Sequence, residues 1–518
     1  MSGPVPTTAS LSDIYPEEAL PAQQKRWTNL LSAFKSRYGK PAEYVSRSPG
    51  RVNCIGEHID YSLYEVVPMA VTQDVLLAVA LSPANGSPKV RIANLEDAKF
   101  PSREFAVQAD GEVEIDSKVL EWTNYFKAGM RGATELLKKQ GKSGVGQISM
   151  DILATGSVPA GGGMSSSAAF VCASALSVMK ASGEDTVDKK DLVETAIVSE
   201  RSVGVNSGGM DQAASVFGEA GSALYVSFLP ELSARPMSFP KTHTPLTFLV
   251  AQSLVAADKH VAAPEQYNLR VTECTLAALV LAKVTGVSSD LAQDAGPLGY
   301  SLRGFHNAFF TKKDTETKGQ KAQLEKLVKL VDDYLPQEEG YSREEMSDIL
   351  GTSIDDLEQK YMTKFPVRAD RFKLQQRATH VYTEALRVLN FKELLESETP
   401  KSEEDSEDLL RGLGGLLNET QDSCRDVYEC SCPELDELCQ LARSAGAYGS
   451  RLTGAGWGGC SVHLVPQDKV EKVKQKWTEK YYKPRFPDMT DERLAEVIVA
   501  SKPGSGSYLF DVKGRESV

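Results

Sequence analysis

One short stretch of the chain combines glycines and serines in a pattern that could bind phosphate. From Gly156 to Ala169 the sequence is GSVPAGGGMSSSAA, between a strand-like alternating segment and an apolar run typical of a buried helix. Adjacent glycines let the backbone approach a ligand closely and adopt positive φ angles without steric cost. Unpaired N–H groups and the helix dipole at a strand–loop–helix junction attract anions, so we expect a phosphate site here. Its candidate residues are Gly161, Gly162, Gly163, Ser165, Ser166 and Ser167.

This glycine–serine loop differs from the two common phosphate-binding loops. It lacks the Gly-Lys-Ser/Thr ending of a Walker A loop, and Ser166 stands where a dinucleotide fingerprint has its last glycine. A flexible turn ahead of a buried helix is the alternative interpretation. If the loop does bind phosphate, its serine hydroxyls could add hydrogen bonds or one metal ligand.

Two acids further along the chain could act on a bound phosphate. Glu200 continues the apolar stripe of a helix predicted over residues 188–201, and a carboxylate on a buried face needs a partner or a metal. A salt bridge to an arginine and a magnesium ion would both meet that need. Asp211 opens a short apolar helix, where the dipole favours its ionised form. A helix cap would explain Asp211 alone, but not the two glycines, Gly208 and Gly209, that precede it.

A third stretch, residues 48–61, places four ionisable side chains within ten residues: Arg51, Glu57, His58 and Asp60. A polar surface loop is one interpretation. A zinc site is a poor one, because the local sequence offers no third ligand. A sugar site is a third interpretation, since each carboxylate can accept hydrogen bonds from two hydroxyl groups.

Other segments must bring these groups together. Helices are predicted over residues 122–137 and from Tyr267 to Lys283. Near the C-terminus, Gly454, Gly456 and Gly459 match G-x-G-x-x-G, but a strand is predicted after them instead of a helix. A glycine hairpin beside a ligand therefore fits better than a dinucleotide-binding fold.

Composition narrows the class of protein. The 518 residues are 41% hydrophobic and 25% charged, which is ordinary for a soluble globular protein, and they suffice for two or three domains. The net charge of −13 argues against nucleic acid as a partner. The sequence has no apolar run long enough to span a membrane and no visible signal peptide. Eight cysteines are too few for a disulfide scaffold, so we expect a cytoplasmic protein.

Taken together, the three glycine-rich stretches and PGRVNCIGEHIDYS resemble the motifs of the GHMP small-molecule kinase superfamily, and in particular the signature of its galactokinase family. The resemblance runs from about Trp27 to the C-terminus, and the pattern of inserts is most similar to that of the fungal members. It implies an α+β fold of two domains. These are an N-terminal ribosomal S5 domain 2-like domain (23–240) and a C-terminal ferredoxin-like domain (241–518) with a helical insert at about 290–410. Residues 1–22, rich in Pro, Ser and Ala, are expected to be a disordered tail.

The resemblance also implies an activity. Members of the family convert ATP and D-galactose into ADP and α-D-galactose 1-phosphate, the first committed step of galactose catabolism by the Leloir pathway, with Mg²⁺ as cofactor. By this similarity the glycine–serine loop would hold the triphosphate, and Ser166 and Glu200 would bind Mg²⁺. Asp211 would be the catalytic carboxylate, with Arg51 lying against it and the transferred phosphoryl group. The implied sugar contacts are Arg51, Glu57, His58, Asp60, Gly208, Asp211 and Tyr267, and Trp122 falls near the adenine pocket.

Two alternatives share these motifs. Kinases for N-acetylgalactosamine share nearly all of these motifs. The resemblance implies that those kinases carry phenylalanine where this chain has Tyr267, which argues against this alternative. Some fungal relatives are galactose sensors that bind a transcriptional repressor. Those that have lost kinase activity shorten the serine–alanine run, which is complete here from Ser165 to Ala169, so catalysis is expected whether or not a sensing role accompanies it.

Overall fold

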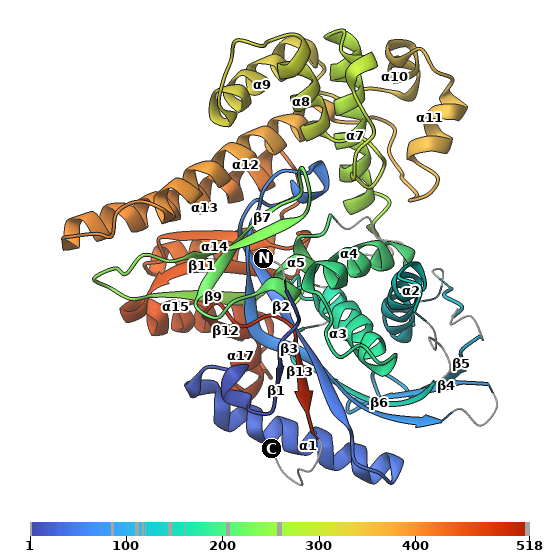
Figure 1. The fold of residues 1–518 in the computed structure, drawn as a ribbon. Coiled ribbons are helices and arrows are strands. Elements are labelled where there is room, and N and C mark those ends of the chain that lie inside the picture. Colours follow the sequence, from blue (N-terminus) through green and yellow to red (C-terminus); the bar gives the residue numbers. More distant parts are fainter. Residues whose placement is uncertain are drawn as a thin grey trace.

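The computed structural model of the protein describes residues 3–83, 87–108, 113–116, 119, 121–142, 148–159, 161–203, 208–255 and 262–512. Two large sheets organise the chain, and a group of helices, α7 to α11, extends beyond them at one end of the molecule (Figure 1). This mixture of helix and sheet in two parts agrees with the α+β prediction.

The larger sheet has seven strands in the order β1-β13-β2-β3-β6-β4-β5. Successive side chains of a strand point to opposite faces, so along β3 Leu76 and Ala78 pack on one side while Leu77 and Val79 pack on the other. Both faces are therefore covered. The strands are β1 (Thr7–Thr8), β2 (Tyr44–Ile55), β3 (Val67–Pro83), β4 (Lys89–Asn94), β5 (Arg103–Ala106), β6 (Ile148–Gly156) and β13 (Tyr508–Asp511).

Helices pack on both faces of the seven-stranded sheet. Helix α1 (Leu20–Tyr38) covers one face with Trp27, Leu30 and Phe34. The other face carries α2 (Thr123–Lys139), α3 (Ser166–Ala181), α4 (Lys189–Glu200) and α5 (Met210–Phe217), with a hairpin of β7 (Ser222–Ser227) and β8 (Ser233–Ser238) following them. The helices predicted to start beside Trp122, after the glycine–serine loop and after Asp188 are confirmed.

The smaller sheet is antiparallel, in the order β10-β11-β9-β12. Leu249 and Ala251 of β9 face α14 and α15, whereas Val250 faces the main core. The predicted glycine hairpin near the C-terminus is confirmed, because it joins β10 to β11. The elements are β9 (Leu246–Gln252), β10 (Gly449–Thr453), β11 (Cys460–Pro466), β12 (Ile498–Ser501), α14 (Pro433–Ala445), α15 (Val470–Trp477) and α17 (Asp491–Val497).

A helical region separates β9 from β10 in the sequence. It begins with the helix predicted at Tyr267 and ends with a helix that packs on β10. Its members are α7 (Tyr267–Val284), α8 (Leu302–Lys312), α9 (Gln320–Tyr334), α10 (Arg343–Leu350), α11 (Ile354–Tyr361), α12 (Leu374–Leu395) and α13 (Glu403–Asp426). In the parts of the chain that the structure describes, no helix is both long and apolar enough to cross a bilayer.

The N-terminal segment differs from the prediction. We expected residues 1–22 to be a disordered tail, but residues 3–22 pack onto the larger sheet. Thr7 and Thr8 pair in parallel with β13, and Leu11, Ile14 and Tyr15 are buried against α1 and the sheet. These apolar side chains are spaced irregularly among prolines and serines, so neither helical nor strand periodicity revealed that they form a core.

The end of the chain also departs from the predicted boundary. The sequence predicts a C-terminal domain over residues 241–518, yet β13 pairs with β2 in the larger sheet, with Phe510 opposite Val45. Leu509 and Phe510 are buried there. The chain thus returns to the first sheet because β2 offers an open edge for pairing, which local sequence does not reveal.

Candidate active site

The centre of the site is an ion pair between Arg51 and Asp211. Register shifts in β2 on either side of Arg51 mark a bulged strand, and the arginine Nε lies 2.6 Å from Asp211 Oδ1. Its Nη1 donates to the carbonyl of Gly163 at 2.7 Å. Burial lowers the pKa of Arg51, but Asp211 and Glu57 raise it above its usual value, so the guanidinium stays charged. One side chain therefore links β2, the start of α5 and the glycine–serine loop.

The glycine–serine loop reaches the same carboxylate from the other side. Ser165, which precedes α3, has a φ of 58°, and its hydroxyl donates to Asp211 Oδ2 at 2.5 Å. A Cβ atom on Gly163, whose φ is 73°, would lie 2.8 Å from the carbonyl oxygen of Thr453 in the β10–β11 hairpin. Only glycine fits there. The first N–H groups of any helix lack intrahelical partners, and this end of α3 directly follows Ser165.

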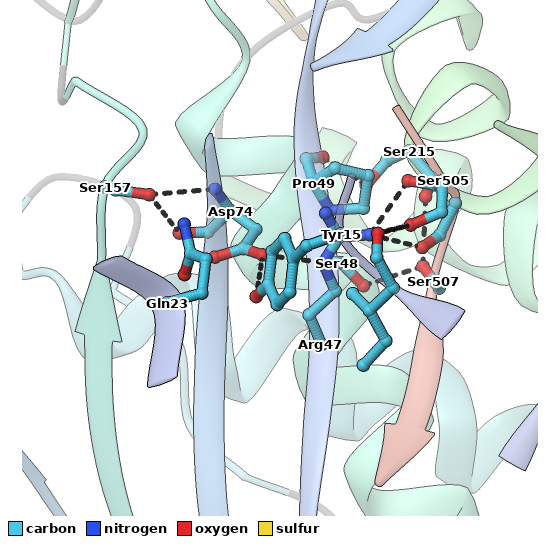
Figure 2. Close-up of polar contacts among 12 residues, drawn as sticks. Tyr15, Gln23, Arg47, Ser48, Pro49, Asp74, Ser157, Ser215, Ser505 and Ser507 are labelled. Carbon is cyan, nitrogen blue, oxygen red and sulfur yellow. Dashed lines mark hydrogen bonds and ion pairs between the residues drawn. The ribbon is translucent and has the colours of Figure 1, made fainter. Parts of the chain in front are cut away.

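A buried polar network joins β2, α5 and the C-terminal segment close to the ion pair in the sequence, and Figure 2 shows its members Pro49, Ser215 and Ser507. Ser215 lies one turn after Asp211 on α5, and its hydroxyl donates to the carbonyl of Pro49, two residues before Arg51, at 2.6 Å. The hydroxyl of Ser507, near the C-terminus, donates to the carbonyl of Ser215 at 3.1 Å. Thus α5 and β2 are joined at a second point, and the C-terminal segment takes part.

The base of the glycine–serine loop is held by the same network. The carbonyl of Asp74 on β3 accepts from the N–H of Ser157 at 2.9 Å, and the Ser157 hydroxyl accepts from the Asp74 N–H at 3.1 Å. The Asp74 carboxylate accepts from Arg47 Nε at 2.6 Å and from the Tyr15 hydroxyl at 2.6 Å (Figure 2). Sequence reasoning missed these residues, because nothing local marks Asp74 or Ser215 as more than ordinary strand and helix residues.

Asp60 lies beside the first turn of α5. Its carboxylate accepts from the N–H groups of Tyr61 at 2.9 Å and Met210 at 3.3 Å. A Cβ atom on Gly208 would come within 2.3 Å of this carboxylate, so glycine is required there. Burial, followed by the nearby charge of Asp211, raises the pKa of Asp60 to about 6.

His58 and Tyr267 form an aromatic wall next to Asp60. The ring centroids of His58 and Tyr267 are 5.6 Å apart, and the ring of Trp457, from the glycine hairpin, is 5.8 Å from that of His58. Both His58 nitrogens have protein partners, the Tyr61 hydroxyl at 3.0 Å and the Ala455 carbonyl at 2.9 Å. Burial and the neighbouring Asp60 raise the pKa of Tyr267 well above its usual value, so its hydroxyl remains protonated.

Glu57 is more constrained than the sequence indicated. Its Oε2 forms a buried ion pair with Arg451 of β10 and accepts from the N–H of Gly454 at 3.1 Å. Arg451 in turn donates to the carbonyl of Asn53 at 3.0 Å. The Glu57 carboxylate thus ties the charged stretch to the glycine hairpin, and Arg451 is a further member of the site that sequence reasoning missed.

Glu200 and Ser166 could hold a divalent cation. Glu200 ends α4, is 5% exposed, and accepts a hydrogen bond from the Gln212 amide, one residue after Asp211. The half-buried Ser166 is the first residue of α3. Among the described residues no three His, Cys, Asp or Glu side chains gather into a metal cage. A carboxylate and a hydroxyl nevertheless suit Mg²⁺, which keeps several waters and binds through one or two protein oxygens plus phosphate.

Trp122 lies at the far end of this arrangement. It precedes α2, and its ring is 5.7 Å from that of Phe170, one turn after Ser166 on α3. Its indole N–H donates to the carbonyl of Pro101 at 2.9 Å. The structure therefore places Trp122 against the first turns of α3, which follow the glycine–serine loop. It brings together in one region the residues Arg51, Glu57, His58, Asp60, Gly208, Asp211 and Tyr267.

Known proteins resemble this chain along almost its whole length. Residues 32–81 match the galactokinase galactose-binding signature, residues 124–219 the GHMP kinases N terminal domain, and residues 406–483 the GHMP kinases C terminal family. A galactokinase of Saccharomyces cerevisiae is 42% identical over 93% of this chain and 94% of its own. A galactokinase of Candida parapsilosis is 41% identical over 94% and 95%, respectively.

One solved structure shows the same fold. A Lactococcus lactis galactokinase complexed with galactose aligns over 93% of this chain and 99% of its own, with a TM-score of 0.61 and 22% identity. At 22% identity this match shows a shared fold and does not assign roles to individual residues.

Proposed function

This chain belongs to the galactokinase family of the GHMP kinases, and from that premise we propose that it transfers the γ-phosphoryl group of ATP to the anomeric hydroxyl of D-galactose. The products would be ADP and α-D-galactose 1-phosphate, the entry into galactose catabolism. The observation that carries the proposal is the Arg51–Asp211 ion pair, because the charged stretch, the glycine–serine loop and the α5 turn all meet there.

In this mechanism Asp211 accepts the proton of the anomeric hydroxyl as its oxygen attacks the γ-phosphorus. The bond between that phosphorus and the β–γ bridging oxygen breaks, and ADP leaves. Phosphoryl transfer depends on positioning and charge neutralisation more than on covalent catalysis. Arg51 suits this role, since it orients the Asp211 carboxylate through Nε and carries a positive charge beside the transferred group. Removing one such donor typically costs about 3 kcal/mol in the transition state.

The glycine–serine loop would hold the triphosphate of ATP. The N–H groups of Gly161, Gly163 and the first turn of α3 suit an anion, and both glycines have positive φ angles. The N–H of Gly162 instead donates to the carbonyl of Pro159 at 3.1 Å, which closes the turn. Ser166 and Glu200 would hold Mg²⁺, which neutralises phosphate charge when bound. Trp122 with Phe170 would flank the adenine base.

The sugar would lie between Asp60, Gly208 and Tyr267. The Asp60 carboxylate can accept from sugar hydroxyls, and the protonated Tyr267 hydroxyl can donate or accept. His58 has both nitrogens engaged, so we assign it to shaping the wall of the pocket by ring contact. Glu57 would reach the sugar only with the oxygen that does not face Arg451.

Two alternatives are less well supported. Phosphorylation of N-acetylgalactosamine is not favoured, because the matched relatives are galactokinases and residue 267 is tyrosine instead of phenylalanine. A sensing role with a transcriptional repressor stays a prediction, which a pull-down dependent on galactose and ATP would test. We place the reaction in the cytoplasm, where the eight free thiols would remain reduced.

The deciding experiment measures ADP release from MgATP with a panel of hexoses. Galactose and 2-deoxygalactose should be phosphorylated, whereas glucose and N-acetylgalactosamine should be poor substrates. Phosphate should appear on the anomeric oxygen, as judged by ³¹P coupling to the C1 proton. Preference for N-acetylgalactosamine, or ADP release that is independent of sugar, would refute the proposal.

A further inference from the structure

The loop that carries the sugar residues has an unusual backbone. Gly56 has a φ of 100° and His58 a φ of 60°, and both lie in the left-handed region that L-residues disfavour. A backbone of this kind persists only when surrounding groups hold it. Residues 56–60, which we term the signature loop, therefore need specific support.

That support comes from α12, in the helical region. The Oε1 atom of Glu384 accepts from the N–H of Gly56 at 2.8 Å and from the N–H of Glu57 at 3.0 Å. Two successive N–H groups pointing at one carboxylate oxygen form an anion-binding turn, here filled by a side chain of the same protein.

The carbonyl group of Glu57 is held from the same helix. His380 Nε2 lies 3.0 Å from the carbonyl oxygen of Glu57, and its Nδ1 lies 2.8 Å from the hydroxyl of Ser423. Since a carbonyl can only accept, Nε2 carries the proton and Nδ1 accepts from Ser423. His380 and Glu384 are one turn apart and lie on the same face of α12. From this face Glu384 accepts from the N–H of Glu57, and His380 donates to its C=O.

Glu384 is itself fixed in place. Its second oxygen accepts from Arg387 Nε at 2.8 Å and from the Thr420 hydroxyl at 2.8 Å, and the side chain is fully buried. Burial raises the pKa of Glu384, but Arg387, His380 and Arg451 together lower it to about 2, so it is ionised. Four donors thus fix the orientation of the Glu384 carboxylate: two N–H groups of the signature loop, Arg387 and Thr420. Because the carboxylate cannot rotate, it also fixes the position of the two loop N–H groups.

We propose that Glu384 and His380 are positioning residues of the sugar site, which hold the signature loop in the conformation that presents Glu57, His58 and Asp60. Neither touches the sugar, since both are fully buried. The inference rests on the proposed function, because it takes the signature loop as the sugar-binding loop. It gives the helical region an indirect part in sugar recognition, through the signature loop.

The test compares Michaelis constants for the two substrates. In Glu384→Gln the amide nitrogen cannot accept from Arg387 and Thr420, or, if flipped, from Gly56 and Glu57. We expect the KM for galactose and the calorimetric Kd for galactose to rise about tenfold or more. The KM for ATP should stay within about twofold of wild type, because the glycine–serine loop has no bond to α12 among the described residues.

A second pair of variants tests the carbonyl contact. His380→Ala should also raise the galactose KM, whereas His380→Gln, whose amide nitrogen can still donate to the Glu57 carbonyl, should recover most of the loss. This pair keeps the proposal testable if Glu384→Gln does not fold.

Glu273→Gln is the matched control. Glu273 is a buried acid that anchors the same helix at another place, through Arg377 Nε at 2.8 Å and the N–H of Lys373 at 2.8 Å. Glu273→Gln should lower the Tm by about as much as Glu384→Gln does, but it should leave the KM for galactose unchanged. If Glu384→Gln and His380→Ala behave like this control, the contacts are merely structural and the proposal is overturned. If the wild type prefers another hexose, the proposed function fails, and the comparison is repeated with that hexose.

Discussion

Arg51 and Asp211 form an ion pair in which the two partners are unequally covered, the arginine side chain being 3% and the aspartate side chain 17% exposed. Nε of the arginine is 2.6 Å from Oδ1 of the aspartate, and Ser165 holds Oδ2 from the glycine–serine loop. The carboxylate is thus held from two sides and remains partly exposed. Such a group can meet a substrate hydroxyl without first reorganising, which is the arrangement that electrostatic catalysis needs.

Asp211→Ala should bind MgATP normally and lose turnover by about two to three orders of magnitude, in line with the loss of general-base and electrostatic catalysis. The substitution leaves the N–H groups of α3 and the loop glycines in place, so nucleotide affinity should persist. Steady-state turnover and calorimetric ATP binding check the two halves of the expectation. Near-normal activity would remove Asp211 from the mechanism.

Glu200→Gln should change the dependence on magnesium. The carboxylate is buried at the end of α4 and accepts a hydrogen bond from Gln212, and carboxylate oxygens are ligands that Mg²⁺ prefers. We expect the Mg²⁺ concentration for half-maximal activity to rise severalfold, with partial recovery at high Mg²⁺. Equilibrium binding of MgATP measured over the same Mg²⁺ range provides a readout without turnover. An equal loss at low and saturating Mg²⁺ would identify Glu200 as a structural partner only.

Asp60→Ala should weaken sugar discrimination. A site built to bond a hydroxyl rejects a sugar that misplaces it, because the buried carboxylate is left unpaired at a cost of roughly 1–3 kcal/mol. The wild type should phosphorylate galactose and 2-deoxygalactose and refuse glucose, which differs at C4. The variant should lose galactose turnover, narrow the galactose-to-glucose ratio, and keep the KM for ATP. If the galactose-to-glucose ratio of Asp60→Ala equals that of the wild type, Asp60 does not determine sugar selectivity, and Tyr267 is the next candidate.

Asp60 should also reduce stability at neutral pH. Its folded-state pKa is raised to about 6 from the ordinary 3.8, so the folded protein holds this proton more tightly than the unfolded chain. The free energy of unfolding therefore falls as the pH rises between those two values and stays lowered above them. Asp60→Asn removes the charge at nearly constant size and should raise the Tm above pH 6, with little effect near pH 4.

Asp151→Asn is the control for this prediction, because its pKa shift has the opposite sign. Although burial raises the pKa of Asp151, Arg91 and Lys40 lower it overall, so its ionised form stabilises the fold. Asp151→Asn should therefore lower the Tm at neutral pH. If Asp60→Asn lowers the Tm at pH 7 as well, the Asp60 carboxylate is not under electrostatic strain.

Much of the site could be predicted from local sequence. Glycines at Gly161 and Gly163 allow positive φ angles, and an apolar run after three serines specifies a helix start, so the loop and α3 follow from neighbouring residues alone. The clustering of Arg51, Glu57, His58 and Asp60 is likewise visible in one short stretch. Backbone freedom and hydrophobic period are local properties, which is why these features could be recognised without the fold.

The partners of these residues were decided only by the tertiary structure. Glu384 bonds Gly56 across 328 positions of the chain, Arg451 pairs with Glu57, and the hairpin carbonyl of Thr453 excludes a side chain at Gly163. Nothing in the sequence around Glu384 distinguishes it from the other acids of its helix. Which distant groups share a buried volume depends on how whole helices and sheets pack, and no local pattern encodes that. The sequence alone indicated Glu57 and His58 as sugar residues. Only the fold shows that Glu57 is paired with Arg451 and that His58 is hydrogen-bonded to Ala455 and Tyr61.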